Sequence, residues 1–366
     1  MQFLVSVATL GVFLAAAQPR AQAQRFFYRF TPIVDTAQGF PISDLGVTFP
    51  CQNSEKLVAY EAPFGSSSDI FTSLNLGAPN SFADSTALGY SGFSTTCSIN
   101  ANGVVLFLAY QGDAEILLLC SAGTQPQNLL STGGTYSDFE RFQLNSQGKA
   151  VVRAARSDGS GDVILTETAG GSANIIATTS RGSPYTSFEG VSINNAGTVA
   201  FVAGKPDGSS GVFTVSENGL TQMVADISCP GYYGEIDLND KGSVAFDGAT
   251  TDGTATVWRA DNPGSGYVIT KIIDANAVDA AQFEAVSINN SGQVSSFFED
   301  PNYGYNVAFG NGGLSLLSPI VVRPYENVLG RLTVLGTTSQ DSLNDSGQIA
   351  LLIGFFDGSS VIALAQ

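Results

Sequence analysis

Two observations predict an all-β chain that folds as a seven-bladed β-propeller of four-stranded antiparallel blades. The first is a repeated ten-residue stretch, whose clearest copy is SINNAGTVAF at 192–201. The second is an alternation of apolar residues with a period of two on both sides of that stretch, which is the pattern of β-strands. After residue 23, no segment has the periodicity of an amphipathic helix.

The repeated stretch predicts a β-hairpin at the start of each blade. In the copy at 192–201, Asn194 can hydrogen-bond to its own backbone to begin a turn, and Gly197 supplies the positive φ that returns the chain. Copies recur at intervals of 45 to 55 residues, and the copy at 51–60 is degenerate because Lys56 replaces the glycine. A period of this length is typical of propeller blades. The anchoring asparagines are Asn53, Asn100, Asn145, Asn194, Asn239, Asn289 and Asn344.

One complete repeat predicts four strands, at 188–194, 198–205, 212–217 and 220–227. The last repeat stops after its third strand, whereas the segment FFYRFTPIVDT at 26–36 belongs to no hairpin and resembles the fourth strand LTQMVADI at 220–227. We therefore expect the N-terminal strand to complete the seventh blade, which would otherwise expose an unpaired edge.

The N-terminus resembles a secretory signal peptide. An apolar run at 3–17 is followed by Ala21-Gln22-Ala23, which matches a signal-peptidase site. This predicts a signal peptide at 1–23, a single propeller domain at 24–366, and a secreted, extracellular protein. Because the run has no preceding lysine or arginine, an uncleaved anchor is the alternative.

The composition excludes some partners. The chain has 15 Lys+Arg against 32 Asp+Glu, a net charge of -17. Such a surface repels nucleic acid and anionic membranes, so we expect neither as a partner once the signal is removed, and we expect a monomer. Solubility alone would explain the charge, and attraction of cations or basic partners is the alternative.

The four cysteines leave their pairing open. Cys97 and Cys120 fall on the first and third strands of one blade, too far apart for a disulfide. Cys51 and Cys97 are offset by one position in the repeat, so their side chains are expected to point in opposite directions unless the first repeat slips. Cys229 lies in a loop several blades away. Free buried thiols are the alternative to a Cys51–Cys97 disulfide.

The absence of histidine excludes histidine-based catalytic triads and the commonest transition-metal ligand, and leaves carboxylates as the abundant reactive group. One set lies 13 residues after five of the seven anchors, in the turn between the second and third strands; Asn302 and Ser66 occupy that position in the other two repeats. An Asp-Gly turn explains these aspartates, and a weak calcium site is the alternative; otherwise we expect no cofactor. The candidate ligands are Asp113, Asp158, Asp207, Asp252 and Asp357.

A second set of carboxylates occurs where the first strand of a blade begins. If that strand is innermost, these residues surround one mouth of a central channel; otherwise they are solvated residues at the strand entry. They are Glu140, Glu189, Glu235 and Glu284. Loops on the same face carry tyrosines that suit a sugar or a peptide, although scattered surface aromatics are ordinary. The candidate ligand-binding tyrosines are Tyr185, Tyr232, Tyr233, Tyr303 and Tyr305.

The repeats resemble a family of bacterial secreted proteins with tandem NxxGxVAF repeats. The resemblance rests on the stretch at 192–201, the segment DGSSGVF at 207–213 and the strand LTQMVAD at 220–226. It implies an extracellular β-propeller, often with varied C-terminal anchors, and no established activity or catalytic residues. This chain differs in lacking such an anchor, in its weak first repeat and in an insertion at 318–331.

These observations together predict a non-catalytic extracellular binding protein whose ligand, a carbohydrate or a peptide, lies on the face with the four glutamates. The alternatives are a carboxylate-dependent enzyme, such as a glycoside hydrolase, which needs only two acidic groups, and a purely structural surface protein. No residue is assigned a catalytic role.

Overall fold

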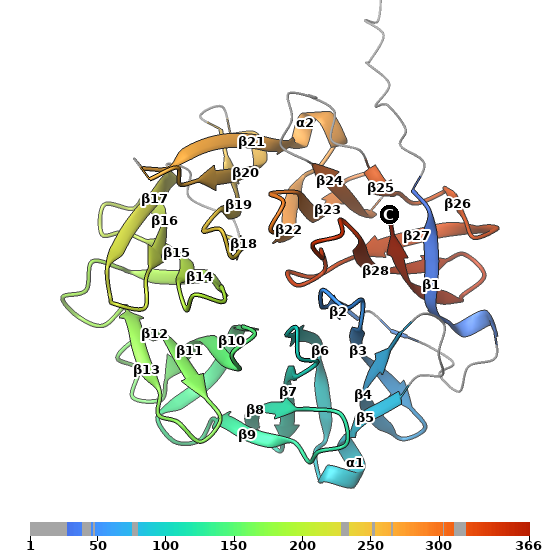
Figure 1. Cartoon of the computed structure of the whole chain (residues 1–366), viewed down its shortest axis with the longest axis horizontal. Helices are drawn as coiled ribbons and strands as arrows, with labels where there is room; N and C mark the ends of the chain where they lie inside the picture. The colour runs from blue at the N-terminus through green and yellow to red at the C-terminus, as the bar shows by residue number, and fades with distance from the viewer. Residues whose placement is uncertain are drawn as a thin grey trace, which may run out of the picture.

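The computed structural model of the chain is a ring of seven antiparallel sheets, which confirms the predicted seven-bladed propeller (Figure 1). It describes residues 28–38, 45–46, 48–74, 80–227, 234–250, 253–264, 266–302, 304–310 and 320–366. The predicted signal peptide at 1–23, Cys229, Tyr232, Tyr233, Asp252 and Tyr303 lie outside these residues. In the part that is described, no helix is long and apolar enough to cross a membrane.

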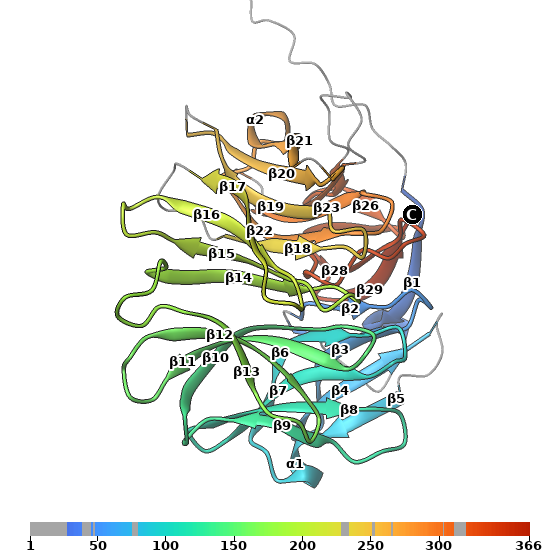
Figure 2. The ribbon, with the colours of Figure 1, turned by 60° about the vertical axis from the view of Figure 1, so that its left-hand side comes forward.

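Each of the first six blades takes its four strands consecutively from the chain, and the first strand lies nearest the centre of the ring (Figure 1). In Figure 2, the strands of blade 4 lie side by side. Blade 1 contains β2 (Cys51–Gln52), β3 (Val58–Phe64), β4 (Ser67–Ser73) and β5 (Asn80–Asp84); blade 2 contains β6 (Gly92–Ile99), β7 (Val105–Gln111), β8 (Ala114–Cys120) and β9 (Gln127–Ser131); blade 3 contains β10 (Tyr136–Leu144), β11 (Lys149–Arg156), β12 (Asp162–Thr168) and β13 (Asn174–Thr178). Blade 4 contains β14 (Ser187–Ile193), β15 (Val199–Gly204), β16 (Ser210–Val215) and β17 (Thr221–Ile227); blade 5 contains β18 (Ile236–Leu238), β19 (Val244–Ala249), β20 (Ala255–Asp261) and β21 (Val268–Asp274); blade 6 contains β22 (Gln282–Ile288), β23 (Val294–Asp300), β24 (Gly304–Gly310) and β25 (Ile320–Val322).

The seventh blade joins the two ends of the described chain, as predicted. It consists of β27 (Arg331–Thr337), β28 (Ile349–Phe355), β29 (Ser360–Ala365) and the N-terminal strand β1 (Phe30–Asp35) on its outer edge. Strand β26 (Asn327–Val328), from the predicted insertion, extends β27 as a short hairpin. The helices are short: η1 (Thr36–Gln38), α1 (Ser85–Leu88) and α2 (Ala275–Val278).

The hydrophobic core lies between neighbouring blades. Between blades 2 and 3, for example, Leu106 and Leu108 of β7 pack against Val152 of β11. The two leucines follow their anchor, Asn100, by an even number of residues, whereas Val152 follows its anchor, Asn145, by an odd number. Successive side chains of a strand point to opposite faces of its sheet. Each blade therefore packs its even-numbered positions against one neighbour and its odd-numbered positions against the other, all around the ring.

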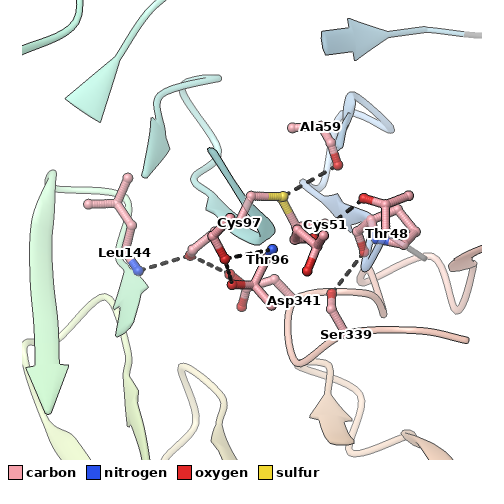
Figure 3. The surroundings of a disulfide bond; sticks show 12 residues. Thr48, Cys51, Ala59, Thr96, Cys97, Leu144, Ser339 and Asp341 are labelled. Carbon is pink, nitrogen blue, oxygen red and sulfur yellow. Dashed lines mark hydrogen bonds between the residues drawn. A yellow bond between two sulfur atoms is a disulfide. The ribbon is translucent and has the colours of Figure 1, made fainter. Parts of the chain in front are cut away.

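The same packing explains a disulfide between Cys51 and Cys97, whose Cα atoms are 6.0 Å apart (Figure 3). The repeat does not slip, because Cys51 pairs with Ala59 as Ser192 pairs with Ala200 in blade 4. The expectation that opposite side-chain directions would keep the cysteines apart was wrong: they belong to adjacent sheets, where opposite directions bring side chains together. Cys120 is a free, buried thiol.

The anchoring asparagines do more than begin turns. The Oδ1 atom of Asn194 accepts hydrogen bonds from the backbone N–H groups of Ala196 and Thr198, and its Nδ2 donates to the carbonyl oxygen of Asn239 in the next blade at 3.1 Å. The same bond links successive anchors from Asn53 to Asn344. At the final junction, Asn344 Nδ2 lies 3.5 Å from Gln52 Oε1. Sequence reasoning assigned the turn and missed this link between blades.

Candidate ligand-binding site

Two cavities lie at the centre of the ring, and the segment Thr338–Asp341 separates them. One cavity, of about 190 Å³, is lined by the asparagine turns. The other, of about 370 Å³, lies at the opposite ends of the innermost strands and is called the glutamate cavity here. Gln340 and Asp341 line both. Gln340 Nε2 donates to the carbonyl oxygens of Val191 at 2.9 Å and Ile236 at 2.7 Å, which holds the segment across the centre.

The glutamate cavity brings together side chains from every blade except the fourth. Its charged residues are Glu140, Arg141, Glu235, Glu284 and Asp341; its aromatic residues are Phe49, Phe142 and Phe297; Thr96, Gln282, Ser339 and Gln340 add polar groups. Its volume is in the range of small-molecule and side-chain binding sites. It therefore combines apolar walls with a few convergent polar groups.

Three of the four predicted glutamates line this cavity, and the fourth lies beside it. Glu189 is half-buried, and its Oε2 is 3.8 Å from Arg153 Nη1, which is also 2.7 Å from Glu140 Oε2. Glu235 is 6% exposed and pairs with Arg141 at 2.6 Å. Burial raises the pKa of Glu235 to about 7, against the opposing charge of Arg141, and the neighbouring Glu284 and Glu189 raise it further.

The predicted tyrosines are placed differently from one another. Tyr305 is 40% exposed and its ring centroid is 5.1 Å from that of Phe297 in the cavity wall. The charge of Glu284 raises the pKa of Tyr305, so the two side chains share one electrostatic environment. The position of Tyr185 in the sequence predicts an exposed loop residue. The structure instead has Tyr185 half-buried between blades 3 and 4. Its ring centroid lies 5.1 Å from that of Phe213 and 5.4 Å from that of Phe201. Burying the ring against these two aromatic side chains is more favourable than leaving it in water.

The predicted turn aspartates lie on separate blades. Asp158 and Asp207 accept hydrogen bonds from the backbone N–H groups of Ser160 and Ser209, and Asp357 does the same for Ser359. These serine contacts lower the pKa of each carboxyl. Asp113 is exposed in the turn between β7 and β8. Among the described residues, no three or more acidic or cysteine side chains are grouped so that they could hold a metal ion.

Several lining residues were missed by sequence reasoning. Asp341 occupies the position three before its anchor, where the corresponding residues are apolar in other blades, such as Val191, Ile236 and Val286. That departure was a signal that the seventh blade differs. Arg141 follows the predicted Glu140 directly, but its pairing with Glu235 joins blades 3 and 5, and no local pattern predicts that.

A buried acidic network lies where the two cavities meet. Gln143 Nε2 donates to Asp237 Oδ1 at 3.1 Å and to Asp341 Oδ1 at 2.6 Å. Ser192 contacts Asp237, and Ser98 contacts Asp341. Burial raises the pKa of Asp237 to about 7, and the nearby Asp341 raises it further. Burial also raises the pKa of Asp341.

These carboxyls predict that the protein is more stable near pH 5 than near pH 8. Asp237 and Glu235 have pKa values of about 7 in the folded protein and about 4 in an unfolded chain. Between these pH values the unfolded state loses the proton first. The free energy of unfolding therefore falls as pH rises from about 4 to 7, by about 4 kcal/mol for each group over the whole range, and stays low above pH 7. Melting temperatures at pH 5 and pH 8 measure the effect. Asp237→Asn should reduce the difference, whereas Asp113→Asn, at an exposed position, should not; an unchanged difference in Asp237→Asn would contradict the assignment.

Comparisons with known proteins support the fold alone. No protein-family model matches the chain, and no curated protein matches it. Among solved structures, it resembles prolyl oligopeptidase B from Galerina marginata, with 10% identity, a TM-score of 0.57, and coverage of 86% of this chain and 48% of that one. It also resembles a structure described for two prolyl endopeptidases, with 12% identity, a TM-score of 0.56, and coverage of 87% and 50%. The chain thus spans about half the length of each.

A third similar structure is TolB from Acinetobacter baumannii, with 11% identity, a TM-score of 0.46, and coverage of 84% of this chain and 79% of that one. At their identities, the two prolyl peptidase structures are similar to this chain in fold and not in activity.

Proposed function

We propose that the protein is a secreted, non-catalytic binding protein that holds an extracellular carbohydrate or peptide in the glutamate cavity. The observation that carries the proposal is the cavity itself, about 370 Å³ in volume and built from residues of six blades. Charged groups and phenylalanine rings converge there on a rigid scaffold, which is the usual composition of a ligand site.

Binding is favoured over catalysis by how the carboxyls are engaged. Glu235 is paired with Arg141, and Glu140 with Arg153. Asp341 is held by Gln143 and Ser98. These contacts fix the side chains within the scaffold, and the sequence contains no histidine to move a proton.

A carboxylate enzyme is the second candidate, and one observation favours it. The pKa of Glu235, about 7, is that of a carboxyl that can donate a proton at neutral pH. A glycoside hydrolase would use such an acid together with a second carboxylate.

A combined glycan and peptide binding array with a hydrolysis screen tests the proposed function. Saturable binding without turnover, weakened at least tenfold by Glu284→Gln, is the expected result. Circular dichroism and melting curves check that the variant is folded. Hydrolysis that Glu235→Gln abolishes would replace the proposal with the enzyme, and no binding in either class would refute it.

A further inference from the structure

The glutamate cavity and its surroundings contain more carboxyls than cations. Four carboxyls line it, from Glu140, Glu235, Glu284 and Asp341, against the single guanidinium of Arg141. Outside the lining, Arg153 is shared between Glu140 and Glu189. The region is therefore acidic after every ion pair has been counted.

Two lining carboxyls, Asp341 and Glu284, have no cationic partner among the described residues; Asp341 is held by Gln143 and Ser98, which leaves Glu284. Its Oε1 accepts a hydrogen bond from Gln282 Nε2 at 3.1 Å, and within the described ranges no lysine or arginine forms an ion pair with it. Glu284 is half-buried on β22 and lines the cavity, so its carboxylate is partly shielded from bulk water. A charge in such a place attracts a counter-charge more strongly than one on the open surface.

Asp247 is a further buried carboxyl beside Glu235. It is 1% exposed, and no side chain that the structure describes donates a hydrogen bond to its carboxyl oxygens. Its backbone N–H donates to the carbonyl oxygen of Glu235 at 3.1 Å, which places it directly behind the cavity wall. Burial raises the pKa of Asp247, and the charge of Glu235 raises it further. A positive ligand beside Glu235 would lower the cost of ionising both groups.

The walls of the cavity also suit a cation. The rings of Phe49 and Phe297 lie edge to face with centroids 6.2 Å apart, and Tyr305 packs on Phe297 from outside. Aromatic faces attract guanidinium and ammonium groups through their quadrupole, and they cover the aliphatic part of a lysine or arginine side chain. A neutral sugar would use the rings but would leave the charge of Glu284 unbalanced.

Resting on the proposed function, we propose that the glutamate cavity takes the basic side chain of an extracellular peptide, with its cation at Glu284 and its aliphatic part against Phe297. The occupant is a peptide because the cavity, of about 370 Å³, accommodates one long side chain, and a basic side chain offers both a cation for Glu284 and an aliphatic part for Phe297. An acidic protein surface also favours encounter with a basic peptide over an acidic one.

The experiment uses a peptide array in which each central arginine or lysine has a counterpart with citrulline, which keeps the shape of arginine and removes its charge. Wild-type protein should bind the basic members at least tenfold more tightly than their citrulline counterparts. Glu284→Gln should remove most of that preference. Glu217→Gln is the matched control, because Glu217 is an exposed carboxylate paired with Lys149 beside the asparagine turns; it should leave the preference unchanged.

The outcomes separate this inference from the proposed function. Equal binding of arginine and citrulline peptides would overturn the charge requirement but leave a peptide-binding cavity. Binding of neutral glycans, lost in Glu284→Gln, without binding of basic peptides would also overturn the inference while the proposed function stands. If neither class binds a folded protein, both are wrong.

Discussion

Removal of strand β1 is expected to lower the free energy of unfolding by on the order of 5 kcal/mol, with a large fall in melting temperature. Ile33 and Val34 of this strand are fully buried. They pack between blades 7 and 1, against residues that include Leu352 and Tyr60. Without β1, strand β29 would be an unpaired edge and these surfaces would meet water.

A buried ion pair adds to this loss. Arg331 holds Asp35 in a two-pronged contact, with Nη1 2.9 Å from Oδ1 and Nη2 2.7 Å from Oδ2. Asp35 is 4% exposed. The Arg331 guanidinium also lies 4.0 Å above the Phe355 ring. Deleting β1 therefore leaves Arg331 partly buried without its anion, which is costly in a protein interior.

Calorimetry of chains that begin at Gln24, at Tyr28 and at Thr36 tests the strand directly. The first two chains retain β1 and should have the same melting temperature. Their comparison measures any effect of shortening the chain without removing the strand. The third should melt far lower or fail to fold. In the full chain, Arg331→Ala provides a second measurement, since it should destabilise the protein while β1 stays in place. Equal midpoints for all three chains would show that blade 7 does not need β1.

Asn194→Ala is expected to destabilise the protein by about 3 kcal/mol. The change leaves the N–H groups of Ala196 and Thr198 and the carbonyl oxygen of Asn239 without their side-chain partner. Asn194 is 5% exposed, so water replaces these bonds poorly. The neighbouring Asn195 is half-buried; its Nδ2 donates to Asp240 and its Oδ1 accepts from the backbone N–H of Ser146, where water can replace both bonds. Asn195→Ala should therefore cost under about 1 kcal/mol and is the matched control.

Asn194→Asp separates the two roles of the anchor. Aspartate keeps the oxygen that accepts from the turn, but it has no N–H group for Asn239 and sets a carboxyl against that carbonyl oxygen. If the link between blades matters, denaturant titration should find Asn194→Asp clearly less stable than the wild type. Stability equal to that of the wild type would show that the anchor serves its own turn alone.

The fold could be predicted largely from the sequence because its causes are local. The glycine at the fourth position of each anchor turn has positive φ in the structure, as at Gly197 and Gly242. Even in the degenerate first repeat, Lys56 has a φ of 66° at that position. The residues of the anchor turn and the alternation of apolar side chains with a period of two defined the hairpin of each blade. The number of anchoring asparagines then predicted seven blades. The likeness of the segment at 26–36 to the fourth strand at 220–227 also indicated that β1 would complete the seventh blade.

The contacts across the centre were decided only by the tertiary structure. Closing the ring brings Ser98 to Asp341, which are 243 positions apart, and Gln143 to Asp237, which are 94 apart. The Cys51–Cys97 disulfide depends on which faces of the two neighbouring sheets pack together. The alternation of side chains along a single strand does not reveal that arrangement. The same holds for Glu235, because its pKa depends first on its burial at the centre of the ring and then on the charges of Arg141 from blade 3 and Glu284 from blade 6. The repeat therefore determined the scaffold and the positions of Glu140 and Glu284, whereas the rest of the glutamate cavity depends on single residues outside the repeat, such as Arg141 and Asp341, that meet only when the sheets surround one axis.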